Sequence, residues 1–159
     1  MTSARWIGYV RQMPHEGQTF TNTRSGQQMT FVELRGELLR IETVNPPEAP
    51  REPLHVHPKQ VSGATVNGGD TDAHATQEFR PALDIASFFE TYAALAAEGK
   101  LKSDGMPPAL QLALMIPAFA DEIRVPAPPW PVQRAFAALL GPLARARGYR
   151  ARLSAPGNA

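Results

Sequence analysis

The segment Thr30–Val44 reads TFVELRGELLRIETV and decides the fold of the first half of the chain. Branched and aromatic residues partly alternate with polar ones on both sides of Arg35-Gly36-Glu37, which is typical of two strands joined by a tight turn. We therefore predict a β-hairpin at this position. Upstream, Thr19–Asn22 predicts a short strand that runs into a turn at Gly26.

Downstream of the hairpin, the sequence first predicts loops and turns and then predicts helices. Pro46–Pro50 cannot supply ladder hydrogen bonds, and Val61–Gln77 is mostly small and polar around the turn signature Asn67-Gly68-Gly69-Asp70. At most one weak strand is expected on each side of that turn. The second half then carries apolar residues at steps of three and four, which predicts about three helices.

Each predicted helix has its own boundary signals. The first is expected between Asp84, a good N-cap residue, and Gly99, a stop. The second runs from Pro108 to Ile116 and is kinked or ended by Pro117, and the third covers Pro131–Leu143 with a bend at its Gly-Pro pair. If the stripe of the first helix is core, replacing Phe88 by alanine should cost about 3–5 kcal/mol.

Composition and charge narrow the function. A chain of 159 residues with 43% hydrophobic residues is enough for one domain with a real core. The net charge of +1 gives no field that would favour nucleic acid or a membrane surface, and no window is apolar enough for a signal peptide or a membrane span. With no cysteine, any metal needs His and oxygen ligands. We expect a cytoplasmic protein with a small-molecule partner.

The segment Leu54–Pro58 holds the best candidate for chemistry. In an extended backbone, residues two apart share a face, so His55 and His57 point to the same side of Val56. Two imidazoles can converge on one first-row metal ion. The alternative is a pair of half-exposed histidines on a strand edge without a ligand, which is common for so short a motif.

The wider context resembles a known family. Gly36–Glu42, the proline-rich turn and Pro53–Gln60 together resemble the first conserved motif of bacterial cupins. Four later stretches are similar to the tail of one cupin-domain subgroup: Gln77–Leu83, Phe88-Phe89, Leu110–Leu114 and Pro131–Ala135. The resemblance covers most of the chain and implies a small jelly-roll β-barrel with a metal site, followed by a helical tail.

The resemblance also implies a set of ligands, and this chain departs from it. In cupins the first motif supplies two histidines and a glutamate, and a second motif supplies a third histidine. Here Val61 or Ser62 stands where the glutamate is expected, and the second motif is absent. The candidate metal ligands are therefore His55, His57, Gln60 and His74, for a weakly held Zn, Fe, Ni or Mn ion, and the sequence names no catalytic residue.

Chain length independently indicates that the cupin barrel is incomplete. Between His57 and Phe79 there is room for about one hairpin, whereas a closed barrel needs several more strands. The middle of the barrel is missing from the sequence pattern. Open strand edges would then favour pairing between copies, so we expect a homo-oligomer, most simply a homodimer.

These observations lead to an α+β prediction. A partial cupin-like β-sandwich or jelly roll is expected over residues 1–82, a helical region packed on it over 83–153, and a flexible tail over 154–159. Three functions stay open: a non-catalytic module that binds a small molecule or a metal, a mononuclear metal oxygenase or isomerase, and a shortened cupin that keeps only an association role. The sequence identifies neither the ligand nor the metal.

Overall fold

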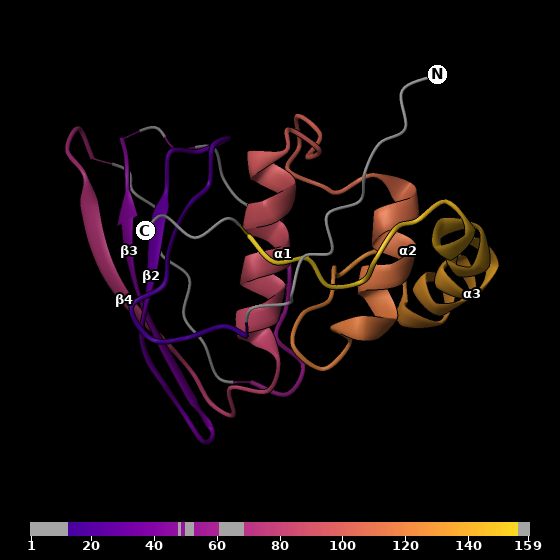
Figure 1. Cartoon of the computed structure of the whole chain (residues 1–159), viewed down its shortest axis with the longest axis horizontal. Coiled ribbons are helices and arrows are strands. Elements are labelled where there is room, and N and C mark those ends of the chain that lie inside the picture. Colours follow the sequence, from indigo (N-terminus) through magenta and orange to yellow (C-terminus); the bar gives the residue numbers. More distant parts are fainter. Residues whose placement is uncertain (1–12, 48, 50–52, 61–68, 156–159) are drawn as a thin grey trace.

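The computed structural model describes residues 13–47, 49, 53–60 and 69–155. Over these residues one antiparallel sheet is followed by helices (Figure 1). The strands are β1 (Thr19–Thr21), β2 (Gln28–Arg35), β3 (Leu38–Asn45) and β4 (Ala73–Phe79), and the helices are α1 (Ile85–Ala97), α2 (Ala109–Ala118) and α3 (Trp130–Ala146). The α+β prediction is confirmed, whereas the domain boundaries stay predictions.

The sheet is a simple meander in the order β1-β2-β3-β4, with every neighbouring pair antiparallel. The predicted hairpin is confirmed by the pairing of β2 with β3 around Gly36, whose φ of 53° suits a residue without Cβ. A jelly roll has two sheets, and the described part of the chain forms one, so that finer prediction is not confirmed. Asn67 and Gly68 of the predicted turn at Asn67–Asp70 lie outside the described residues.

A β-bulge adjusts β2 to the core. Phe31 pairs with Ile41 and Glu33 pairs with Arg40, so Val32 is an extra residue on β2. In a regular strand, Phe31 and a residue three positions later would point to opposite faces. The extra residue lets both Phe31 and Leu34 pack against the core.

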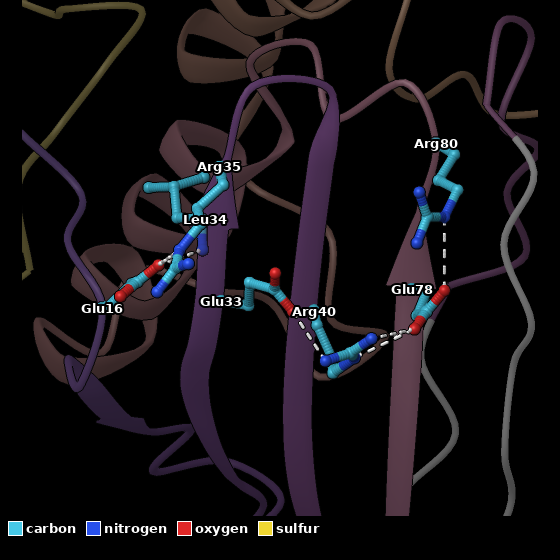
Figure 2. Close-up of polar contacts among 7 residues, drawn as sticks. All are labelled: Glu16, Glu33, Leu34, Arg35, Arg40, Glu78 and Arg80. Atoms are coloured by element: carbon cyan, nitrogen blue, oxygen red, sulfur yellow. Dashed lines mark hydrogen bonds and ion pairs between the residues drawn. The ribbon is translucent and has the colours of Figure 1, made fainter.

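The opposite face of the sheet carries charge. Arg40 on β3 lies directly between its cross-strand partners, Glu33 on β2 and Glu78 on β4. Its guanidinium donates to a Glu33 carboxylate oxygen at 2.6 Å and to Glu78 Oε1 at 2.7 and 2.9 Å, and Arg80 contacts the other oxygen of Glu78 (Figure 2). These hydrogen bonds raise the pKa of Arg40 and lower the pKa of Glu78. This face is therefore a solvated charge network and the other face is the core side.

Helix α1 forms the middle layer of the molecule, between the sheet and the other two helices (Figure 1). One side of it packs on the sheet in a cluster that includes Phe31, Ile41, Phe79 and Ile85. Its other side contacts Met115 and Phe119 of the α2 region through Leu95 and Phe88. A helix covered on two sides needs small residues along it, and α1 is accordingly rich in alanine.

The ends of α1 agree with the prediction in position but not in mechanism. Gly99 follows the helix with a φ of 64°, as expected for a glycine stop. Asp84 precedes the helix, but its side chain makes no capping hydrogen bond. Its carboxylate instead accepts from Arg152 Nε at 2.6 Å, and its N–H donates to the Glu122 carboxylate at 3.0 Å. The helix start is thus tied to two distant segments.

The two later helices also match their predicted positions. α2 ends one residue after Pro117, whereas α3 runs through Gly141 and Pro142 to Ala146. After α3 the chain returns across α1 (Figure 1), where the Leu153 N–H donates to Thr91 Oγ1 at 3.0 Å. No helix in the described part of the chain combines the length and apolar character needed to cross a bilayer.

Candidate functional site

The histidine segment is held against the stretch that follows α2. Val56 and Arg124 form an isolated antiparallel bridge, in which each N–H donates to the other residue's carbonyl oxygen, at 2.8 and 2.9 Å. Leu54 and Val56 are exposed, at 77% and 49%, while His55 and His57 are half-buried. The alternation predicted from the sequence is present, and both imidazoles lie on the inner side with ring centroids 5.1 Å apart.

The hydrogen bonds of the two histidines define their tautomers. His55 Nδ1 lies 2.8 Å from the Pro53 carbonyl oxygen, and His57 Nδ1 lies 2.8 Å from the Glu122 carbonyl oxygen. A carbonyl oxygen only accepts, so the proton of each neutral ring is on Nδ1. Each Nε2 then carries a lone pair, and no group in the described residues donates a hydrogen bond to it.

Gln60 lies beside this pair but is occupied by structural contacts. Its Nε2 donates to the carbonyl oxygens of Pro81 and Ala82 at 2.9 and 2.8 Å, and its Oε1 lies 3.3 Å from His57 Nδ1. The side chain is buried. Its amide oxygen therefore faces a ring N–H, and Gln60 fixes His57 to the loop that precedes α1.

His74 is the one candidate ligand that the fold places elsewhere. It lies on β4 opposite Val44 and is exposed. Phe79, at the other end of β4, contacts the His57 ring with centroids 5.4 Å apart. His74 is five residues from Phe79, so it points to the opposite face of the sheet and lies about 17 Å along the strand. The structure thus brings together His55, His57 and Gln60, but not His74.

Burial changes the acidity of His57. Its pKa is lowered from 6.5, mainly because burial disfavours the charged ring and also because His55 lies close. The hydrogen bonds to the Glu122 carbonyl and to Gln60 oppose this shift. The neutral ring, with a free Nε2 lone pair, is therefore the form that the folded protein favours at neutral pH.

The two histidines line a cavity of about 360 Å³. Its wall comes from the inner side of the sheet, from all three helices and from the histidine segment. The aromatic members of the wall are Phe20, Phe88, Phe89, Tyr92, Phe119, Trp130 and Phe136. Such a volume, with a mostly apolar wall and a few polar groups, is typical of sites for small molecules.

The cavity and its polar edge were only partly foreseen. The Phe88-Phe89 stripe was predicted to be buried, but no periodicity shows that it would leave a hollow. Carboxylates usually face solvent, but Glu90 and Glu122 are buried, at 1% and 6% exposure. Glu90 accepts from Gln18 Nε2 at 2.8 Å, and Glu122 accepts from the Asp84 N–H. These partners are 72 and 38 residues away, so no local signal reveals them.

Among the described residues, no group of three or more His, Cys, Asp or Glu side chains is arranged to hold a metal. The chain matches no family model, and no curated protein or solved structure is significantly similar to it. The cupin resemblance therefore stays a prediction.

Proposed function

We propose that this protein binds an apolar small molecule in the cavity between the sheet and the helices. The observation that carries the proposal is the cavity itself: about 360 Å³ of space walled by aromatic and aliphatic side chains. Empty apolar space forfeits dispersion contacts, so an apolar occupant would gain them. This agrees with the small-molecule module that the cupin resemblance implies.

The test uses a neutral fluorescent apolar probe, N-phenyl-1-naphthylamine, titrated against the protein. Leu112 lines the cavity, whereas Leu139 on α3 is 78% exposed and does not. Leu112→Trp should fill part of the cavity and weaken probe binding several-fold, and Leu139→Trp should leave binding unchanged. Equal binding by both variants and by the wild type would contradict the proposal, provided that circular dichroism shows folded protein.

Metal binding at the histidine pair is the second candidate, and one observation favours it. A metal-bound histidine usually donates its other ring N–H to a carbonyl or carboxylate, and both Nδ1 atoms here do so. His55 and His57 fit as two ligands through Nε2, while Gln60 is already used by the fold. A metal would therefore need further ligands from water or from the small molecule, which agrees with the expectation of weak binding of Zn, Fe, Ni or Mn.

Calorimetric titration with Zn²⁺ tests this candidate. Because the ligating nitrogen must be unprotonated, binding should weaken in acid and be lost in His57→Ala. His74→Ala is the matched control and should have no effect. Tight binding that survives both acid and His57→Ala would place the metal elsewhere.

Self-association also stays a prediction. Beyond the open sheet edges expected from the sequence, α3 exposes Val132, Leu139 and Leu143. Light scattering over a range of concentrations separates a monomer from the expected homo-oligomer.

A further inference from the structure

The polar groups on the cavity wall restrict what the occupant can be, and the following inference rests on the proposed binding function. Three polar side chains of the cavity wall already donate a hydrogen bond to another group of the protein. Tyr92 O–H donates to the Gly105 carbonyl at 2.9 Å, and Gln27 Nε2 donates to Asn45 Oδ1 at 2.6 Å. Gln133 Nε2 donates to the Val125 and Pro128 carbonyls at 2.9 and 2.6 Å. These groups shape the wall rather than offer those hydrogens to a ligand.

The Nε2 atoms of His55 and His57 differ from these groups, because they are acceptors and no described residue donates a hydrogen bond to them. Their partner nitrogens are fixed as donors by the Pro53 and Glu122 carbonyls. Both rings belong to the cavity wall, and they lie at right angles to each other within 5.1 Å. A cavity that presents two adjacent lone pairs among aromatic rings is complementary to a hydrogen-bond donor on an apolar body.

The charged residues of the cavity wall indicate whether the donor group of the ligand is charged or neutral. No carboxylate is among the described residues that line the cavity, so a protonated amine would lack a counter-ion there. The cation among these residues is Arg124, which is held in place by its bridge to Val56. Its guanidinium stacks on Trp130 at 4.1 Å, and its Nε donates to the Ala120 carbonyl. The charge of Arg124 is therefore engaged within the protein, and no Lys or other Arg is among the described lining residues to pair with a carboxylate at the histidine pair.

We propose that the occupant is a neutral aromatic alcohol of the phenol class, whose hydroxyl donates to Nε2 of His55 or His57. The ring of the ligand contacts Phe88, Phe89 and Phe119, which already pack edge to face with one another or with Phe79.

The experiment compares 4-propylphenol, 4-propylanisole and 4-propylbenzoate by isothermal titration calorimetry at pH 7.5 with EDTA present. The anisole keeps the ring and the oxygen but lacks the donor hydrogen. A net hydrogen bond corresponds to about a three- to tenfold change in Kd, so the phenol should bind about three- to tenfold more tightly than the anisole. The benzoate should bind most weakly of the three.

Variants assign the preference to the imidazoles. The first variant is His55→Phe. The imidazole that it removes hydrogen-bonds only to the nearby Pro53 carbonyl, so this substitution should disturb the fold less than the second variant, His57→Phe. In each, the preference for phenol over anisole should shrink, and in the double variant it should vanish while the anisole still binds. His74→Phe is the control and should keep the wild-type preference.

The outcomes separate the two proposals. If phenol and anisole bind wild type equally, or if the benzoate binds most tightly, the phenol assignment is overturned and the apolar cavity function stands. A preference that persists in the double variant also overturns it. If none of the three ligands binds and the fluorescent probe does not bind either, both proposals fail together.

Discussion

Arg40 and His57 lie on opposite sides of the same sheet, and each is held by two hydrogen-bonding groups. Arg40 donates to two carboxylates across neighbouring strands on the outer face. His57 contacts a carbonyl, an amide oxygen and the ring of Phe79 on the inner side. The number of contacts is similar, but the charged groups of the Arg40 network lie open to water on the outer face, whereas the His57 ring is half-buried against Phe79. Solvent exposure rather than the number of contacts should therefore decide how much each site contributes to the stability of the fold.

The largest effect is expected on the inner side, at Phe119. Its ring is 1% exposed and packs against Phe88 and Leu95. Phe119→Ala should lower the free energy of unfolding by about 3–5 kcal/mol, because it removes a buried ring. Phe88 is only partly buried, so Phe88→Ala should cost less than the figure expected from its place in the sequence stripe. Urea unfolding of both variants checks this order, and a larger loss for Phe88→Ala would contradict it.

Gln60 should follow, because its buried amide connects the histidine segment to the loop before α1. Gln60→Met keeps a similar volume but leaves the Pro81 carbonyl without this donor, while the Ala82 carbonyl keeps the Ile85 N–H at 3.3 Å. An unpaired buried group costs about 1–3 kcal/mol, so the loss should fall in that range. Gln28→Met, at an exposed position of β2, is the matched control. Similar thermal midpoints for the two variants would show that the Gln60 contacts contribute little.

The pH dependence of stability isolates His57 from its neighbours. The folded pKa of His57 lies below the unfolded value of 6.5, so the unfolded state takes up the proton first. The stabilisation is complete above pH 6.5 and is lost as the pH falls through the folded pKa. Wild type should therefore lose stability between pH 7.5 and 5, and His57→Phe should lose less over that window. Thermal melts at the two pH values, with His74→Phe as control, measure the difference; equal losses in all three proteins would sink the idea.

Features set by neighbouring residues could be predicted from the sequence, whereas features set by contacts between distant residues could not. The first strand, the hairpin, the helices and the shared face of His55 and His57 follow from patterns within a few residues, and all are present. β4 lies where at most one weak strand is expected, and the segment before the turn lies outside the described residues. The capping role predicted for the Asp84 side chain was wrong, because Asp84 meets Glu122 and Arg152 only after folding. His74 was grouped with the pair by residue type alone, and strand alternation places it on the other face. The cavity depends on the spacing of layers, which no local pattern encodes.

The smallest effect is expected on the outer face, at Arg40. Its side chain and those of Glu33 and Glu78 are 38%, 27% and 41% exposed, so water replaces most of what a substitution removes. Arg40→Met should lower the thermal midpoint less than Gln60→Met does. The loss should shrink further in high salt, because mobile ions screen exposed charges. It should not vanish, since one arginine joins three strands and a network is stronger than an isolated pair. A loss as large as that of Phe119→Ala, or one insensitive to salt, would mean that the outer face is as important to the fold as the inner one, and that exposure does not separate the two sides of this sheet.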